Sequence, residues 1–149
     1  MLINIDPLLH PDLLHALRGM GHGDEIALVD ANFPATANAR RLLRLDGVDI
    51  PRAGEAILSV LPLDSFVAHP VLRMEMVDHP EEVPAVQQEF QSLVNRAAGR
   101  ELPMGGLERH AFYRRAREAF AVVVTGERRG YGCFLLSKGV LRPDGSVWW

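Results

Sequence analysis

Residues 21–34 read GHGDEIALVDANFP and contain one short apolar run with polar residues at both ends. The run, residues 25–29, is too short for a typical helix. It is flanked by Gly23 and Pro34, which favour turns. A short apolar run between turn residues is typical of a strand buried on both faces. We therefore predict a mostly buried strand over residues 25–29.

Two ionisable residues bracket this predicted strand. Asp30 follows it directly, and His22 precedes it in a turn that leads from a predicted helix. In open α/β sheets, ligands bind beyond the carboxyl ends of strands, so Asp30 is well placed to contact a substrate. Loops held by rigid elements are common positions for catalytic groups, which makes His22 a second candidate.

Helical and strand-like patterns alternate along the rest of the chain. Helical spacing of apolar residues, with Pro or Gly at the ends, predicts helices over residues 11–20, 51–61, 84–98 and 111–120. Apolar runs predict strands over residues 71–77, 107–109, 121–125 and 133–137. The alternation predicts an α/β fold, with a mixed, mostly parallel sheet and helices on its faces. We expect a single domain over residues 1–149, of which residues 141–149 form a tail.

Four residues carry local structural expectations. Gly21 is expected to end the first helix in the left-handed conformation that favours glycine. Lys138, the only lysine, is expected at the surface. Trp148 and Trp149 are costly to leave in water, so we expect them to pack on the domain or on a neighbouring subunit.

The composition fits a single domain of moderate charge. The chain has 149 residues, of which 48% are hydrophobic and 23% charged, enough to bury a substantial core. Its formal net charge of −3 does not support a general attraction to nucleic acid or to an anionic membrane.

Cysteine content and hydropathy indicate the compartment. One cysteine, Cys133, excludes an intrachain disulfide framework and a four-cysteine zinc site, and fits a reducing environment. Residues 1–6 lack a basic, apolar leader pattern, and no run of roughly 18 apolar residues occurs. We expect a cytoplasmic protein that does not span a membrane.

Several segments resemble the fucose mutarotase and ribose pyranase family, in the family's order. They are MGHGDEI (20–26), DANFP (30–34), RLDG (44–47), LPLDS (61–65), RHAFY (109–113), TGE (125–127) and YG (131–132). The HGDE string and the pair Phe112 and Tyr113 favour the fucose branch. The resemblance covers nearly the whole chain and also implies a strand over residues 41–45.

This resemblance implies an isomerase that interconverts the α and β anomers of L-fucose or a related sugar. It also implies a ring-shaped homo-oligomer, such as a decamer, with sites near subunit contacts. A ribose-type pyranase, which interconverts pyranose and furanose rings, and a non-catalytic sugar-binding protein remain as alternatives. The bound partner would be a monosaccharide in each case.

Mutarotation needs an acid at the ring oxygen and a base at the anomeric hydroxyl, but no metal or redox cofactor. Histidine has the side-chain pKa nearest neutrality, so His22 is the predicted proton donor. Asp30 could be the base or could bind sugar hydroxyls. Asp24 and Glu25 are second choices, with capping or ion pairing as their expected use.

The remaining site residues follow from the resemblance. Arg109 is implied to bind substrate, and a guanidinium offers several fixed donors to sugar oxygens. The following residue, His110, is expected to face outward. Tyr131, Gly132 and Cys133 fall on the family's substrate-binding tripeptide, where the family usually has asparagine in place of Cys133. A thiol is a weak hydrogen-bonding partner, so this departure could alter which sugar is preferred.

Histidine spacing gives no indication of a metal site. No two of the six histidines are four positions apart, and none has a matched ligand spacing. We therefore predict no metal ligands and no cofactor.

Overall fold

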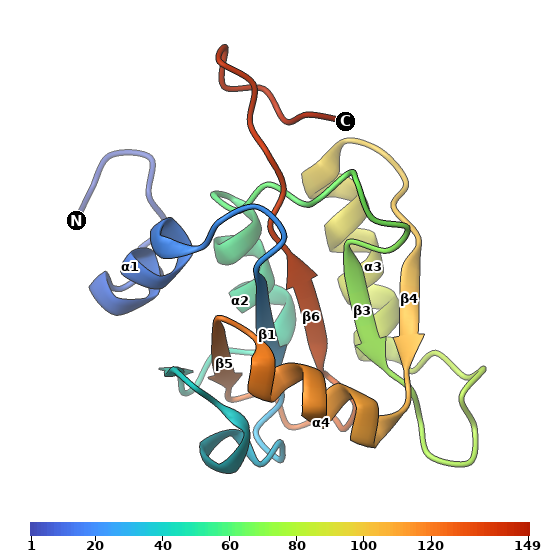
Figure 1. Cartoon of the computed structure of the whole chain (residues 1–149). Helices are drawn as coiled ribbons and strands as arrows, with labels where there is room; N and C mark the ends of the chain where they lie inside the picture. The colour runs from blue at the N-terminus through green and yellow to red at the C-terminus, as the bar shows by residue number, and fades with distance from the viewer.

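The predicted strand over residues 25–29 is present and lies inside a six-stranded sheet (Figure 1). The computed structural model describes residues 1–149. Its strands are β1 Glu25–Val29, β2 Leu42–Leu45, β3 Val71–Met74, β4 Met104–Leu107, β5 Ala121–Thr125 and β6 Phe134–Ser137. Their order is β2-β5-β1-β6-β3-β4, so β1 has a neighbour on each side. Residues 26–29 are accordingly buried on both faces.

Strand β6 runs against all the others. β1 pairs in parallel with β5, as do β2 with β5 and β3 with β4. β6 is antiparallel to its neighbours β1 and β3. The mixed, mostly parallel sheet is thus confirmed. The five parallel strands end at one edge, where β6 begins. We call this the carboxyl edge and the opposite one the amino edge.

Helices cover both faces of the sheet, as predicted. They are α1 Pro11–Gly19, α2 Ile50–Leu58, α3 Ala85–Ala98 and α4 Arg109–Glu118, with a short 3-10 helix, η1, at Ala35–Asn38. A core of 24 buried residues lies between the sheet and α1 to α3, and a core of 12 lies beneath α4 and η1. In Figure 1, α4 crosses in front of the sheet, whereas α2 and α3 lie behind it. No helix combines the length and the apolar character needed to cross a membrane.

Side-chain caps and one glycine explain where the helices begin and end. Asp49 starts α2 by accepting a hydrogen bond from the Arg52 amide at 2.9 Å. Gly99 ends α3 in the left-handed conformation, with φ of 67°. The same expectation for Gly21 is wrong. The chain leaves α1 in an extended conformation, and Gly23 is the left-handed residue that turns it into β1.

The strand predicted over residues 107–109 was placed too late in the sequence. Strand β4 covers residues 104–107, because the Glu108 carboxylate accepts hydrogen bonds from the amides of residues 110 and 111 and so starts α4. The apolar pattern hid β4, since two of its four residues are glycine. A side chain at Gly105 would come within 2.7 Å of Leu72 Cδ2, so the strand requires small residues.

Strand β3 is also shorter than the predicted 71–77. The chain reverses after it: Asp78 has a left-handed φ of 64°, and Met76 pairs with His79 across the turn. The helix predicted over 51–61 likewise ends at Leu58. In both cases, apolar residues continue past the element, into a packed loop at Leu61 and an exposed loop at Val77, and periodicity does not distinguish them from the element itself.

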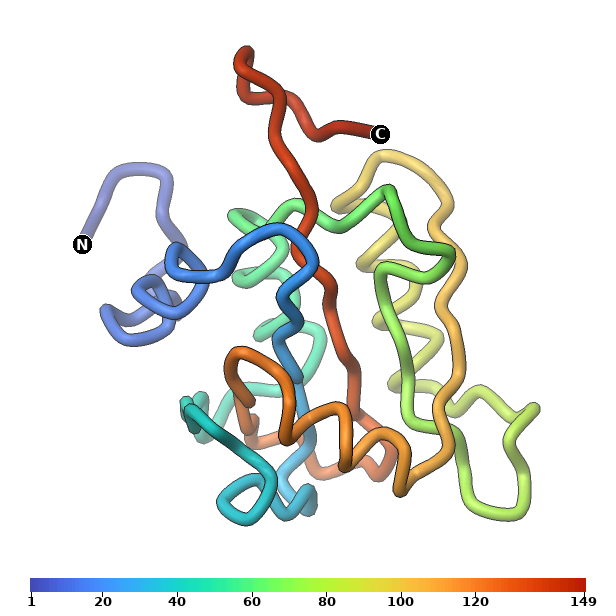
Figure 2. The backbone as a smooth tube through the Cα atoms, viewed as in Figure 1, coloured from blue at the N-terminus to red at the C-terminus, as the bar shows by residue number.

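The C-terminal tail extends beyond the amino edge (Figure 2). Residues 141 and 147 pair within it, and the Trp148 amide donates to the Val140 carbonyl at 2.9 Å. Trp148 packs against Phe66 with 6.2 Å between ring centroids, yet remains 46% exposed. The expected packing of this tryptophan on the domain is therefore partial.

The expectation that Lys138 lies at the surface is confirmed only in part. Its ammonium group is partly buried and donates hydrogen bonds to the carbonyls of Leu17 and Met20 at 2.8 and 2.7 Å. These are carbonyls at the end of α1 that have no partner within the helix. Burial lowers the pKa of Lys138. This lysine therefore ties α1 to the end of β6.

The core predicts a large stability loss for Phe90→Ala. Phe90 is fully buried and stacks on Phe134 with ring centroids 4.0 Å apart. Removing such a ring lowers the free energy of unfolding by about 3 to 5 kcal/mol, and urea unfolding would measure this loss. Phe66→Ala is the size-matched control, since Phe66 is 61% exposed. Equal losses in the two variants would contradict this description of the core.

Candidate active site

The residues predicted to form the site lie at two opposite edges of the sheet. Asp30 follows the end of β1, Arg109 follows the end of β4 by two residues, and residues 131–133 precede β6. All of these are at the carboxyl edge, because β6 is antiparallel to the other strands. His22 precedes β1 and lies at the amino edge. Strand β1 alone is about 15 Å long.

Asp30 is buried against the one cysteine of the chain. Only 4% of Asp30 is exposed. Its Oδ1 accepts a hydrogen bond from the Asn32 amide at 2.9 Å, and its Oδ2 accepts one from Cys133 Sγ at 3.3 Å. Burial, and then the Asp30 carboxylate, raise the pKa of the Cys133 thiol. Cys133 therefore stays a thiol that supports Asp30, and it lacks the thiolate that a nucleophile requires.

A buried glutamine holds the turn that presents Tyr131. This tyrosine adopts a left-handed conformation with φ of 64°, which is uncommon for a bulky residue. Gln87 is fully buried and donates from Nε2 to the carbonyls of Met74 and Tyr131, at 2.7 and 2.9 Å. The Tyr131 hydroxyl accepts from the Val77 amide at 3.2 Å. Gln87 was not predicted as a site residue, because nothing in a helical glutamine signals this contact.

The same loop is fixed by the buried carboxylate of Glu127. Its two oxygens accept from the Arg129 guanidinium at 3.0 and 2.8 Å, and Oε2 also accepts from the Ile50 amide at 3.3 Å. The Arg129 guanidinium lowers the pKa of Glu127 to about 2. The Glu127 carbonyl accepts from the Ala31 amide at 2.9 Å. Glu127 thus connects the loop before β6 to the turn that carries Asp30.

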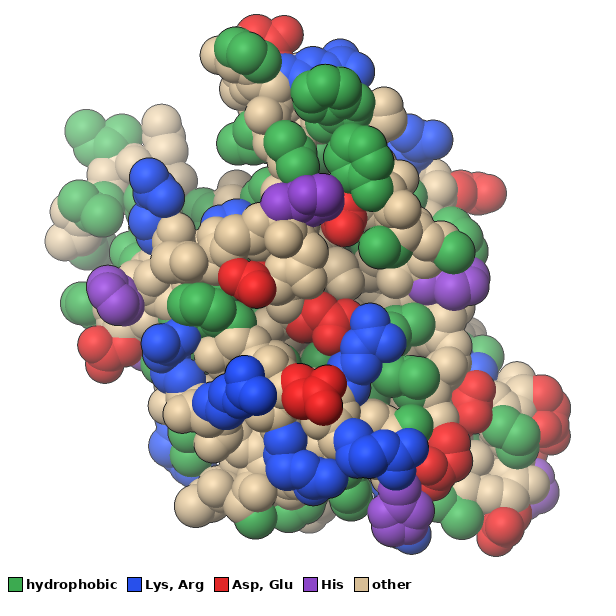
Figure 3. Space-filling model, in the orientation of Figure 1, with side chains coloured by type: hydrophobic (Ala, Val, Ile, Leu, Met, Phe, Trp, Pro, Cys, Tyr) green, Lys and Arg blue, Asp and Glu red, His purple; other side chains and the backbone are tan.

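Arg109 is exposed at the first turn of α4. The polar contact of its guanidinium is His110 Nε2 at 3.4 Å, and His110 faces outward as predicted. Basic side chains gather on this face of the molecule, over α4 (Figure 3). Strand β4 lies three strand spacings from β1, about 14 Å. No contact joins Arg109 to Asp30 within the chain, so the structure does not bring these two predicted residues together.

His22 is paired with a buried carboxylate at the amino edge. Its Nε2 lies 3.1 Å from Asp64 Oδ1; the His22 side chain is 48% exposed and that of Asp64 is 2% exposed. The ring also meets the edge of Phe66, with centroids 5.3 Å apart. Asp64 was part of the LPLDS segment that carried the family resemblance, but it was given no role.

Of the second-choice acids, Glu25 has the expected use in an ion pair, whereas Asp24 closes a turn instead of capping a helix or forming an ion pair. Asp24 Oδ2 accepts a hydrogen bond from the Gly21 amide at 2.7 Å and so closes the turn that holds His22. Glu25 forms a two-bond ion pair with Arg115, each bond 2.9 Å long, and ties α4 to the sheet. Neither acid contacts His22 in the structure.

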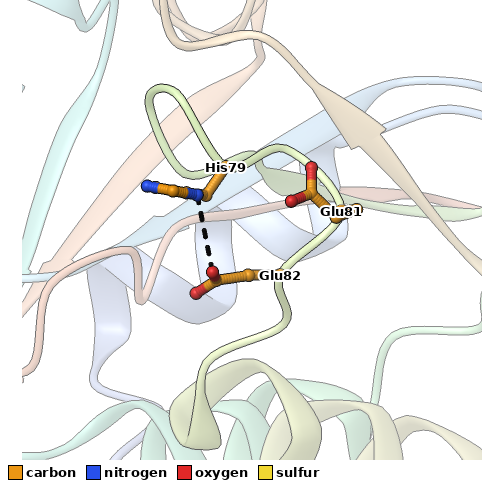
Figure 4. Close-up of side chains that lie close together, drawn as sticks. All are labelled: His79, Glu81 and Glu82. Carbon is orange, nitrogen blue, oxygen red and sulfur yellow. Dashed lines mark ion pairs between the residues drawn. The ribbon is translucent and has the colours of Figure 1, made fainter.

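One group of metal-ligand residue types occurs at the carboxyl edge, on the loop that follows β3. His79, Glu81 and Glu82 lie on the loop between β3 and α3, with ligand atoms within 4.8 Å of one another (Figure 4). His79 Nδ1 is 3.5 Å from Glu82 Oε1. All three side chains are exposed, and an exposed ion pair adds only about 0 to 1 kcal/mol to the free energy of unfolding. This group was not predicted from the sequence.

The fold and these groups define a small α/β protein with carboxylate, guanidinium, phenol and imidazole groups suited to a hydroxyl-rich ligand. The chain belongs to the RbsD / FucU transport protein family, whose model matches residues 3–141. The resemblance inferred from the sequence is therefore confirmed.

Named relatives match almost the whole chain. Fucose mutarotase of Bos taurus is 46% identical over 149 aligned residues, which cover 96% of each protein. L-fucose mutarotase of Histophilus somni is 39% identical over 140 residues, covering 94% of this chain and 97% of that protein. The crystal structure of the fucose mutarotase in complex with L-fucose from Streptococcus pneumoniae superposes with a TM-score of 0.88. It is 38% identical and the match covers 95% of this chain and all of that one.

Because Glu127 is ionised and bonded to Arg129, we expect the protein to lose stability in acid. Glu127→Gln should lack this part of the pH dependence. Because the pKa is lowered from 4.5 to about 2, the ionised carboxylate stabilises the fold above pH 4.5, and this contribution disappears as the pH falls towards 2. Urea unfolding should give the variant a lower free energy of unfolding than the unaltered protein near neutral pH. This difference should shrink as the pH falls from 4.5 towards 2. Glu118→Gln, at an exposed position without an ion pair, is the control. If the difference in the free energy of unfolding did not change with pH, the lowered pKa of Glu127 would be contradicted.

Proposed function

We propose that this protein is a mutarotase that interconverts the α and β anomers of L-fucose or a closely related sugar. The observation that carries the proposal is its identity of 38 to 46% to proteins named fucose mutarotase, over nearly the whole chain. The ionisable groups support it, since ring opening and closure need only positioned acids and bases.

His22 acts as the proton donor in this proposal. Its imidazolium gives a proton to the ring oxygen of the sugar as the bond between that oxygen and the anomeric carbon breaks. A base takes the proton of the anomeric hydroxyl, which becomes the aldehyde oxygen, and Asp30 is the carboxylate available for this step. After rotation about the bond beside the aldehyde, the reverse transfers close the ring on its other face. No atom is gained or lost.

Arg109 and the tripeptide 131–133 hold the sugar. A guanidinium donates to several hydroxyl oxygens at once, and the Tyr131 hydroxyl can donate to one more while accepting from the Val77 amide. Cys133 contributes through its hydrogen bond to Asp30. Because the family usually has asparagine at this position, the cysteine of this chain holds the Asp30 carboxylate differently. We infer that Gly132 keeps the turn close to Glu127 and Ile50, because a Cβ there would lie 3.2 Å from both Glu127 Cγ and Ile50 Cγ1.

We further propose that two subunits complete each site. His22 and Asp30 lie at opposite ends of β1, about 15 Å of strand apart, which is longer than a monosaccharide. A sugar that touches both groups must therefore take His22 from one subunit and Asp30 from another. This requirement makes the protein a homo-oligomer, and a closed ring such as a decamer would repeat the contact around its axis. We place the enzyme in the cytoplasm, where its free Cys133 thiol would stay reduced.

Magnetisation-transfer NMR of the anomeric protons tests the activity. The protein should accelerate anomer exchange of L-fucose more than that of D-ribose or L-rhamnose. His22→Ala should reduce this acceleration by on the order of 100-fold or more, because it removes the proton donor. His69→Ala is the control, since His69 is exposed and bonds the Pro103 carbonyl instead of a carboxylate. No acceleration of any sugar, or full activity in His22→Ala, would overturn the proposal.

Mixed oligomers test the two-subunit site. His22→Ala and Asp30→Asn subunits should each be inactive alone. Co-expressed in one oligomer, they should recover part of the exchange activity, because some sites then combine an intact His22 with an intact Asp30. As a control, the His22→Ala and Asp30→Asn proteins are purified separately and then mixed under conditions in which subunits do not exchange. If co-expression recovers nothing although both variants assemble together, each site lies within one subunit.

A further inference from the structure

The buried carboxylate of Asp64 faces one nitrogen of His22 and leaves the other free. Asp64 Oδ1 is 3.1 Å from His22 Nε2, and it also accepts the Phe66 amide proton at 3.0 Å. No hydrogen bond engages Nδ1 of the same ring. The two nitrogens of His22 are therefore in different environments before any ligand arrives.

The end of β6 holds both partners of this pair in place. On one side of it, the Gly23 amide donates to the Lys138 carbonyl at 2.9 Å, next to His22. On the other side, the Asp64 amide donates to the Ser137 carbonyl at 3.0 Å. These backbone bonds fix the turn of His22 to Lys138 and the segment of Asp64 to Ser137, the last residue of β6.

We propose that Asp64 is a positioning residue that makes Nδ1 the proton-donating atom of His22. This inference rests on the proposed function. A carboxylate only accepts hydrogen bonds, so Nε2 facing it carries a proton. When the imidazolium gives up its Nδ1 proton, the neutral ring keeps the Nε2 proton bonded to Asp64. The hydrogen bond of one ring nitrogen thus determines which nitrogen reacts.

Phe66 restricts the ring from a second direction. Its edge-to-face contact with His22 limits rotation of the imidazole about the bond to its Cβ. The amide of Phe66 and the imidazole share Asp64 Oδ1. The carboxylate, the amide and the aromatic ring therefore act on His22 as one rigid support, and the substrate meets the free, exposed side of the imidazole.

The first test compares Asp64→Asn with the unaltered protein. Asparagine keeps the size of the side chain, but its amide can donate to Nε2 and so favour the wrong tautomer of the ring. We expect kcat for anomer exchange to fall at least about tenfold, while KM changes by less than about threefold. Asp6→Asn is the matched control, because Asp6 is a partly buried carboxylate paired with Arg52 at 2.8 Å, away from His22.

A spectroscopic measurement tests the same claim without a variant. Nitrogen-15 chemical shifts of the neutral His22 ring should show a protonated Nε2 and a bare Nδ1. A bare Nε2 would overturn the inference even if Asp64→Asn failed to fold. Unchanged kcat in a folded Asp64→Asn protein would overturn it too. If His22→Ala still abolishes exchange in that case, the proposed function stands and only the role of Asp64 fails.

Discussion

The position of β1 between β5 and β6 is the constraint on which the site depends. It pairs in parallel with β5 and antiparallel with β6, so it cannot shift without breaking the backbone hydrogen bonds to both strands. A shift of one residue would also turn its side chains to the opposite faces. Because β1 is fixed in this way, His22 and Asp30 are held at opposite edges of the sheet.

Each edge then uses buried polar groups to make its loop rigid. At the carboxyl edge, Glu127 and Gln87 bond the backbone and side chains around Asp30 and Tyr131. At the amino edge, Asp64 takes the corresponding role beside His22. A buried polar group without a partner is costly, so these networks strongly favour one loop conformation. The catalytic proposal thus requires two preorganised half-sites, with the sugar between two subunits.

Much of the fold could be predicted from local patterns. Strands β1 and β5 match the predicted residues, because both are apolar runs buried among neighbours and bounded by turn residues. Strand β4 could not be placed, since Gly105 and Gly106 carry no apolar signal. The order of strands was also beyond the sequence, because the insertion of β1 between β5 and β6 depends on contacts between distant segments.

The candidate site was only partly predictable. The position of Asp30 beyond a strand follows from the pattern, whereas Arg109 and Tyr131 were selected only through the family resemblance. Asp64 and Gln87 were missed for a physical reason: Asp64 meets His22 across 42 positions of sequence, and Gln87 meets Tyr131 across 44. The residues next to Asp64 and Gln87 in the sequence give no sign of partners so far away.

A crystal structure of the protein with L-fucose would test the two-subunit site most directly. The account predicts a sugar at a subunit contact, with His22 Nδ1 of one subunit within hydrogen-bonding distance of the ring oxygen. Asp30 and Tyr131 of a second subunit should contact the same sugar. A sugar bound entirely within one subunit, or bound away from His22, would contradict the account.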